Sequence, residues 1–349
     1  MILHIYPDDK FTFDYIKRIN RLYNIEDHLF YVYYTGQNLC TESMVKEYNN
    51  VFFISSFKEN KFMSDFLKSD KVICHSIFFR TKDIILLSKL QQKSHKKMIW
   101  ALWGGDLYDE YRRNHNTFNP KFKIREFYRR KLIASFYKVL STSDFDQMKL
   151  WYKTNAIQGR GLYSYDFKPI EKENIGDSAK HTIMVGHSAT STCCHQEAFE
   201  MLKKYKDSIE VYCPLSYPPN TEYINKVDEL GIGIFGQGYH AMKEFMNYNE
   251  YSKFLNTIEV GIFNNDRQQG MGNIVNLLYL GKKVYMNKKN TLYSALKEEG
   301  FTLFDVEEIK DASFCEELTE SQKEKNRKLV EYRYSDENFK DVWNKVFYY

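Results

Sequence analysis

TIMVGHSATSTCCHQEAFEMLKKYKDSIEVYC, residues 182–213, contains one complete strand–loop–helix–strand unit and decides the fold class. Residues 182–186 form a short apolar run with the composition of a buried strand, and residues 209–213 form a second. Between them a helical pattern covers residues 197–204. Because two strands joined by a crossover helix pair in parallel, this stretch predicts an α/β fold with a parallel sheet.

The same alternation continues on both sides of that unit. Further strands are expected at 2–6, 28–34, 51–55, 71–75, 97–103, 138–140, 233–236, 260–263 and 283–287. Helical patterns separate them at 11–22, 83–90, 221–230, 251–256 and 274–280. This order of elements predicts two doubly wound, Rossmann-like lobes that face a cleft.

The periodicity lapses between residues 159 and 180, in GRGLYSYDFKPIEKENIGDSAK. Polar residues mixed with glycine and proline are typical of a linker, so we expect residues 161–180 to join two lobes. Residues 1–160 then form the N-terminal lobe and residues 181–320 the C-terminal lobe. Residues 321–349 are polar and are expected to form helices, and packing of these helices on the N-terminal lobe is one possible arrangement.

The composition indicates an intracellular protein without a structural metal. Its 349 residues include six cysteines, which are scattered and form no C-x-x-C pair. That pattern argues against a metal site or a disulfide framework and favours a reducing compartment. The first residues, MILHIYPDDK, do not have the pattern of a signal peptide, and no apolar run approaches the roughly 20 residues of a membrane span. We therefore expect a cytoplasmic location.

Residues 111–138 concentrate positive charge. The segment has nine basic residues and one acid, Glu126, and therefore carries +8 while the whole chain carries +4. The candidate contact residues in it are Arg112, Arg113, Arg129, Arg130 and Lys131. Aromatic residues interleave with the charges, which suits an anionic membrane surface or a phosphate-bearing lipid. A solvated helix face explains the pattern equally well, and nucleic acid is not expected because the rest of the chain is acidic and shows no recognition motif.

Ligands of doubly wound sheets bind beyond the carboxyl ends of the strands, so the loops after strands matter most. The loop after 182–186 offers the hydroxyls of Ser188, Thr190 and Thr192 just before a helix start. Free backbone N–H groups and the helix dipole favour an anion there, and a diphosphate is a natural guest. An ordinary N-cap loop is the alternative. The loop matches neither G-x-G-x-x-G nor a P-loop, so NAD and ATP gain no support.

The loop FNNDRQQGMGN, residues 263–273, is the most informative segment of the chain. Arg267 can hold a diphosphate with two parallel hydrogen bonds. Gln268, Gln269 and Asn273 can bond sugar hydroxyls or an N-acetyl group. Gly270 allows the backbone to approach a ligand closely. We expect this loop to bind a ligand that carries a diphosphate and a sugar.

Two further loops carry candidate residues. In WALWGGDLY, residues 100–108, two glycines permit a bend that presents Asp106 as a general base, with Trp103 stacking on a sugar. Asp106 as a helix cap and Trp103 as a core residue are the alternatives. His75, at the end of the strand 71–75, is the second base candidate. Asp8 and Asp9, after the first strand, are expected to line the same cleft. In PLSYPP, residues 214–219, Tyr217 either stacks on a base or forms part of a stiff turn.

Several of these pieces resemble glycosyltransferase family 56, the fucosaminyltransferase family of enterobacterial common antigen. The resemblance rests on Gly186-His187-Ser188-Ala189-Thr190, on Arg267-Gln268-Gln269-Gly270 with Gly272-Asn273, on Leu280-Gly281-Lys282-Lys283-Val284 and on Trp103-Gly104-Gly105-Asp106. It implies the two-lobed GT-B fold and transfer of 4-acetamido-4,6-dideoxygalactose from a dTDP donor to a polyprenyl-diphosphate-linked saccharide. His187 stands where the family has Asn, which leaves the donor open between dTDP and UDP.

The predicted function is therefore that of a glycosyltransferase of surface polysaccharide synthesis, peripheral on the inner face of the bacterial inner membrane. The donor diphosphate would lie between the loop 188–192 and Arg267, without a metal or other cofactor, and Asp106 would activate the acceptor. A sugar-nucleotide 2-epimerase of the same fold and a non-catalytic saccharide-binding protein are the alternatives.

Overall fold

Two parallel β-sheets organise the chain in the computed structural model, which describes residues 1–349 except 37, 96, 116–117, 142, 162–168 and 172–178. The chain divides into unit 1, Met1–Phe167 with Tyr334–Tyr349, and unit 2, Lys168–Arg333. The predicted α/β class with two doubly wound sheets is confirmed. Most of the expected linker, residues 161–180, lies outside the described residues.

Unit 1 contains a seven-stranded sheet in the order β3-β2-β1-β4-β5-β6-β7, with every pair parallel. The strands are β1 Ile2–Pro7, β2 His28–Tyr33, β3 Val51–Ile54, β4 Lys71–His75, β5 Lys97–Ala101, β6 Lys138–Leu140 and β7 Ile157–Gly159. The helices are α1 Thr12–Leu22, α2 Glu42–Val45, α3 Asn60–Lys68, α4 Thr81–Ser94, α5 Gly105–His115, α6 Pro120–Ser135, α7 Phe145–Trp151 and α14 Asp336–Phe347.

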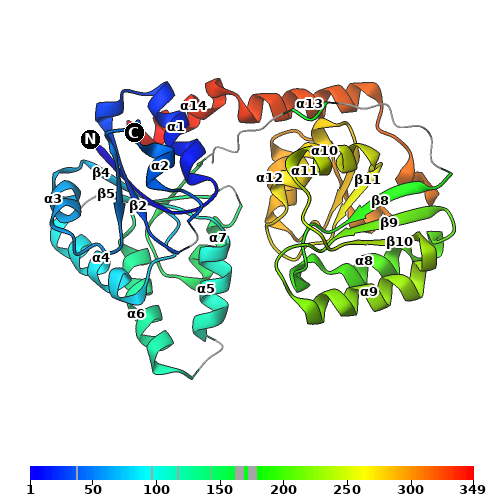
Figure 1. The fold of residues 1–349 in the computed structure, drawn as a ribbon, viewed down its shortest axis with the longest axis horizontal. Helices are drawn as coiled ribbons and strands as arrows, with labels where there is room; N and C mark the ends of the chain where they lie inside the picture. Colours follow the sequence, from blue (N-terminus) through cyan, green and yellow to red (C-terminus); the bar gives the residue numbers. More distant parts are fainter. Residues whose placement is uncertain (37, 96, 116–117, 142, 162–168, 172–178) are drawn as a thin grey trace. The chain divides into compact units, whose positions relative to one another are not determined.

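Unit 2 contains a six-stranded parallel sheet in the order β10-β9-β8-β11-β12-β13. The strands are β8 His181–Val185, β9 Ile209–Pro214, β10 Tyr239–Met242, β11 Val260–Phe263, β12 Lys283–Met286 and β13 Phe304–Asp305. The helices are α8 His195–Leu202, α9 Thr221–Phe235, α10 Tyr248–Thr257, α11 Met271–Tyr279, α12 Thr291–Glu298 and α13 Glu320–Tyr334. Helices α8 and α9 cover one face of this sheet, and α10 and α11 cover the other (Figure 1).

Both sheets reverse their strand order at one point, between β1 and β4 in unit 1 and between β8 and β11 in unit 2. At such a switch point the loops that leave two neighbouring strands run to opposite faces of the sheet, so a crevice opens at the carboxyl ends. The fold therefore indicates the loops after β8 and β11 as the place for a ligand in unit 2.

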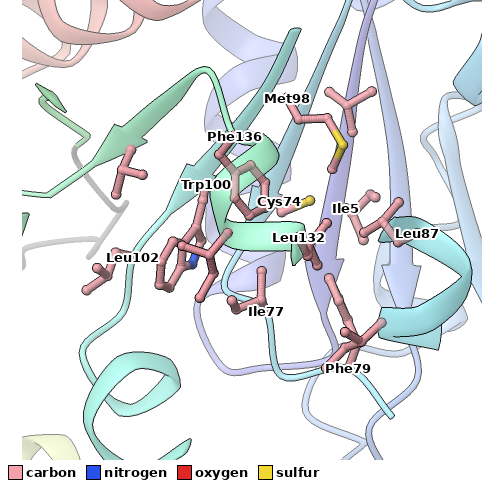
Figure 2. Packing of buried hydrophobic residues seen from close by; sticks show 14 of the residues in the cluster. Ile5, Cys74, Ile77, Phe79, Leu87, Met98, Trp100, Leu102, Leu132 and Phe136 are labelled. Atoms are coloured by element: carbon pink, nitrogen blue, oxygen red, sulfur yellow. The ribbon is translucent and has the colours of Figure 1, made fainter. Parts of the chain in front are cut away.

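The unit 1 sheet is buried on both faces. Leu3 and Ile5 point into a cluster with Trp100, Leu132 and Phe136, which Figure 2 shows packed beside one another. Ile2 and Tyr6 point to the opposite face, into a second cluster that α14 closes with Phe339 and Trp343. Each large apolar side chain buried in this way contributes roughly 1.5–3 kcal/mol.

The C-terminal helix α14 belongs to unit 1 because its end is held by strand residues there. Lys71 Nζ donates to the carbonyl oxygens of Val346 and Phe347, at 3.2 and 2.7 Å. Positive charge at a helix C-terminus is favoured by the helix dipole. At the other end, Arg18 Nε donates to Asp336 Oδ1 at 3.0 Å.

One predicted strand is wrong. Residues 233–236 lie at the end of α9 rather than in a strand, and the strand beside β9 is β10. Gly231 lies inside this helix, and a side chain there would meet the ring of Tyr239 at 2.4 Å, so glycine lets α9 and β10 pack closely. The helix then ends at Gly236, whose φ of +56° suits glycine.

Three buried histidines form a hydrogen-bonded chain under α14. His4 Nδ1 lies 3.1 Å from His75 Nε2, and His4 Nε2 lies 3.0 Å from His28 Nδ1. Burial lowers the pKa of His4 and His75 well below the ordinary value, and lowers the pKa of His28 to about 4. All three rings are therefore neutral in the folded protein near pH 7.

Acid should destabilise unit 1 through this chain. Below pH 6.5 the histidines of the unfolded chain take up protons that the folded histidines cannot. The free energy of unfolding therefore falls as the pH drops toward 4, and the stabilising contribution of the histidines is complete only above pH 6.5. Each histidine contributes a slope of up to about 1.4 kcal/mol per pH unit. Tryptophan fluorescence measures this in urea, because Trp100, Trp103, Trp151 and Trp343 all lie in unit 1.

The His75→Phe variant should show a smaller pH slope than the wild type, because one of the three groups no longer titrates. The control is His95→Asn at an exposed left-handed position, where asparagine is tolerated, and it should keep the wild-type slope. Equal slopes for the wild type and His75→Phe would contradict this assignment.

Candidate functional site

Two loops 80 residues apart in sequence meet at the switch point of unit 2. β8 and β11 pair directly, and Gly186 N donates to the Ile262 carbonyl oxygen at 2.9 Å where they end. Beyond the strands, Asp266 N donates to the Thr192 carbonyl oxygen at 3.1 Å, and Thr192 Oγ1 donates to Gln269 Oε1 at 3.0 Å. The structure therefore brings the two predicted donor-binding loops together.

Two glycines with positive φ shape these loops, and the second of them lies against the first loop. Gly186 has a φ of +71°, and a side chain on it would meet His195 Nε2 at 2.5 Å. Gly270 has a φ of +75°, and a side chain on it would meet His187 Nδ1 at 3.0 Å. A side chain would be strained by the backbone conformation at both positions, and at Gly186 it would also clash with His195. The imidazole of His187 lies directly against Gly270 of the second loop.

The predicted hydroxyl groups form a small network inside the first loop. Ser188 and Thr192 are buried, and Thr190 is half-buried. Ser188 Oγ lies 3.1 Å from Thr190 Oγ1, and Thr190 Oγ1 lies 3.3 Å from the sulfur of Cys193. The sequence analysis did not predict Cys193 and His187 as site residues. Both are close in sequence to Ser188 and Thr190, and this proximity could have indicated that they belong to the same network.

Arg267 is half-buried, and its loop is held from behind. The amide of Asn290 donates to the Arg267 carbonyl oxygen at 2.8 Å. Arg267 Nε and Asn265 Oδ1 are buried and have no hydrogen-bond partner among the residues that the structure describes. Buried polar atoms normally have a partner, so these two indicate a place for a bound polar group.

The remaining candidates of unit 2 lie around this pair of loops. Gln268 is half-buried in the same loop, and Asn273, in the first turn of α11, accepts a hydrogen bond from Tyr251 Oη at 3.1 Å. The Tyr217 carbonyl oxygen accepts from Ala189 N at 2.7 Å, which places the loop after β9 beside the loop after β8. The Tyr217 side chain is 71% exposed and is free to meet a ligand.

The prediction that Asp106 is presented to a ligand is wrong. Its side chain is buried, and Oδ2 accepts hydrogen bonds from Trp100 Nε1 at 2.7 Å and from Ile77 N at 3.0 Å. Oδ1 accepts from Trp103 N at 2.9 Å. Burial raises the pKa of Asp106, against the lowering effect of the nearby Arg129. The carboxylate fixes the loops after β4 and β5 to each other, so it is structural.

The prediction of His75 as the second base candidate is also wrong, because its side chain is buried. Its ring stacks on Tyr6 with centroids 4.2 Å apart and bonds to His4, and burial lowers its pKa well below the usual value. Of the two acids that follow β1, Asp8 is buried and accepts from Thr35 N at 2.8 Å, whereas Asp9 is half-buried at the switch point of unit 1. Burial raises the pKa of Asp9.

Trp103 is half-buried. Its indole meets Phe11 and Tyr6 edge-on, at centroid distances of 6.0 and 5.6 Å. It therefore lies at the same carboxyl edge of the sheet as Asp9.

The basic segment divides into a buried and an exposed part. Arg129, predicted as a membrane contact, is buried: its guanidinium donates to the Asp106 carbonyl oxygen and to Tyr152 Oη. The prediction for Arg129 is wrong because a buried pairing with carbonyl and carboxylate groups uses its charge inside the unit. Arg112, Arg113, Arg130 and Lys131 are exposed.

The exposed part also carries apolar side chains. Every exposed charge on α6 is basic, because its one acid, Glu126, is buried. Phe118, just before the helix, is fully exposed at 102%, and Ile124 and Phe127 are more than half exposed. Lys131 Nζ lies 4.5 Å from the ring centroid of Phe127. Cations and aromatic rings thus share one exposed surface.

Two classes of feature are absent from the described part of the chain. There, no three side chains of histidine, cysteine, aspartate or glutamate are grouped to hold a metal ion. No described helix has the length and apolar character that crossing a bilayer requires.

The fold is similar to solved structures that include a glycosyltransferase, a synthase and a protein with bound UDP and glucose. A glycosyltransferase from Rickettsia africae superposes with a TM-score of 0.61 at 13% identity, covering 99% of this chain and 97% of that one. Anabaena Alr3699/HepE, solved with UDP and glucose, gives 0.64 at 10% identity, covering 100% and 99%. Sucrose-phosphate synthase from Thermosynechococcus elongatus gives 0.64 at 9% identity, covering 99% and 98%.

These likenesses and the two doubly wound sheets define a GT-B glycosyltransferase fold. A family model described as 4-alpha-L-fucosyltransferase glycosyl transferase group 56 matches residues 56–348. The chain belongs to glycosyltransferase family 56, and the resemblance noted in the sequence is confirmed. Membership in a transferase family favours sugar transfer over both the epimerase and the non-catalytic alternative.

Proposed function

We propose that the loops after β8 and β11 bind the diphosphate of a nucleotide-sugar donor. The observation that carries this proposal is the buried Arg267 Nε, which has no partner among the described residues and lies in the loop after β11, at the switch point of the unit 2 sheet. A guanidinium N–H at such a place suits a phosphate oxygen, since charge-assisted bonds are the strong ones. The charge of the leaving nucleotide would then be stabilised by Arg267 and backbone N–H groups instead of a metal.

The donor nucleotide in this proposal is dTDP or UDP. The family resemblance implies dTDP with 4-acetamido-4,6-dideoxygalactose, while the structurally similar Anabaena protein was solved with UDP and glucose. The exposed ring of Tyr217 offers a stacking surface for a base. Gln268, Gln269 and Asn273 supply amide groups for the hydroxyls or the acetamido group of the sugar.

Calorimetric titration of the protein with dTDP, UDP, GDP and CDP, without added metal, tests the donor site. We expect dTDP or UDP to bind selectively. The Arg267→Ala variant should bind that nucleotide about 10- to 100-fold more weakly, because a hydrogen bond to a charged group is lost. The matched control is Arg327→Ala, which removes a partly exposed arginine of α13 that pairs with Glu324, and it should bind like the wild type.

Two outcomes would contradict the proposal. If no nucleotide binds to the folded protein, unit 2 does not hold a nucleotide donor. If Arg267→Ala binds as tightly as the wild type, the diphosphate does not lie at this loop.

For the acceptor we propose a polyprenyl-diphosphate-linked saccharide, reached at the inner face of the bacterial inner membrane. The family resemblance implies this acceptor, and the surface of α5 and α6 supports a membrane contact. Arg112, Arg113, Lys121, Lys123, Arg130 and Lys131 supply positive charge there, and Phe118, Ile124 and Phe127 supply apolar side chains. Each basic residue near an anionic bilayer contributes about 1 kcal/mol.

Vesicle sedimentation tests this surface. The protein should bind vesicles that contain phosphatidylglycerol, should bind them less at high salt, and should not bind pure phosphatidylcholine. The double variant Phe118→Ser and Phe127→Ser should bind roughly tenfold more weakly, because apolar area no longer enters the bilayer. Phe245→Ser is the control, since Phe245 is exposed in unit 2. Equal loss in the control, or no loss in the double variant, would refute this surface.

A further inference from the structure

The sulfur of Cys193 lies inside a ring of hydrogen-bonding groups. Cys193 is buried, and four side-chain groups surround its Sγ: Thr190 Oγ1 at 3.3 Å, Ser188 Oγ at 3.5 Å, His187 Nδ1 at 3.6 Å and Gln269 Nε2 at 3.6 Å. The amide nitrogen of Gln269 can only donate, and the other three groups can donate as well. A neutral thiol is a weak acceptor, so a ring of donors suits a thiolate.

The protonation of Cys193 agrees with this geometry. Burial alone would raise the pKa of the thiol, but the hydrogen bond and electrostatic effect of the His187 ring, together with the Thr190 and Ser188 hydroxyls, outweigh burial and lower the pKa to about 6. Burial instead raises the pKa of the adjacent Cys194 to about 11. The two neighbouring cysteines therefore differ in charge near pH 7.

The other titratable groups around the ring do not add a second thiolate. Burial lowers the pKa of His195 to about 4, which keeps that ring neutral, and burial raises the pKa of both Cys213 and Tyr223. Charged side chains near the two loops come from Glu197 and Asp266, both exposed, and from the half-buried Arg267.

The same ring occupies the place where the donor diphosphate is expected. Ser188 and Thr190 belong to the loop after β8, and Gln269 belongs to the loop after β11, which also carries the two unpaired buried atoms, Arg267 Nε and Asn265 Oδ1. Without a ligand these donors face the protein's own sulfur. A thiolate and a diphosphate cannot share them without repulsion between like charges.

We propose that the donors around Cys193 are the phosphate cradle of the donor site, that the Cys193 thiolate occupies the cradle when no nucleotide is bound, and that binding of a nucleoside diphosphate is coupled to uptake of one proton by this sulfur. This inference rests on the proposed donor site. His187 and Cys193 thereby become donor-binding residues, and the affinity for the donor increases as the pH falls toward neutrality.

The test is calorimetric titration with dTDP-glucose and UDP-glucose, whose diphosphate diesters do not titrate near neutral pH. Titrations at pH 7 and pH 8, each in two buffers with different ionisation enthalpies, give both the affinity and the number of protons exchanged. The wild type should take up about one proton per nucleotide at pH 8 and bind about tenfold more weakly there than at pH 7.

The Cys193→Ser variant separates the alternatives, because it keeps a hydrogen-bonding atom and removes the thiolate. It should bind without proton uptake and with the same affinity at both pH values. Cys194→Ser is the matched control and should behave like the wild type. Proton uptake that persists in Cys193→Ser, or wild-type binding that does not change with pH, would overturn the inference. Absence of any binding by the wild type would instead refute the donor site itself.

A second measurement does not depend on the variant folding. The ultraviolet absorbance of the wild-type thiolate should appear near pH 6, and saturating nucleotide at pH 7 should abolish it. A thiolate signal that nucleotide leaves unchanged would contradict the shared cradle.

Discussion

The direct pairing of β8 with β11 is the constraint on which the site depends. Because these strands are parallel neighbours, their carboxyl ends lie at one edge of the sheet, and the loops of residues 186–193 and 264–270 must start side by side. Hydrogen bonds from Asp266 N and Thr192 Oγ1 then join the loops, and glycine at position 270 leaves out the side chain that would meet His187 of the first loop.

In unit 1, two charged residues that sequence suggests for a site are buried and serve the structure instead. Asp106 and Arg129, which in sequence look like a base and a surface cation, are buried and spend their hydrogen bonds on backbone groups and aromatic side chains of their own unit. A buried charge persists only when it is paired in this way. The exposed cations of α5 and α6 are therefore fewer than the sequence indicates, yet they are still accompanied by exposed apolar side chains. The surface proposed for membrane contact therefore contains only the exposed cations of α5 and α6 and leaves out the buried Arg129.

Most of the fold was predictable because strand composition and helical periodicity are local. The strands 71–75, 138–140 and 260–263 have the predicted bounds. The prediction for 233–236 was wrong because GIFG has the composition of a strand, whereas these residues lie at the end of α9, which packs closely on Tyr239 of β10 through Gly231. The site was predictable only as loops. Sequence places Arg267 after a strand, but it does not show that Ser188 and Thr190 turn toward Cys193, or that Asp106 and His75 turn inward. Side-chain direction depends on tertiary contacts that no local pattern encodes.

The central claim is that the donor nucleotide binds to unit 2 through these two loops. Hydrogen–deuterium exchange measured with and without the nucleotide tests it most directly, because it reports on both loops and on unit 1 in one experiment. The account predicts that nucleotide slows exchange in peptides covering residues 186–193 and 266–270 and leaves the loop of residues 103–108 unchanged. Protection of the unit 1 loop alone, with unchanged exchange at 266–270, would contradict it.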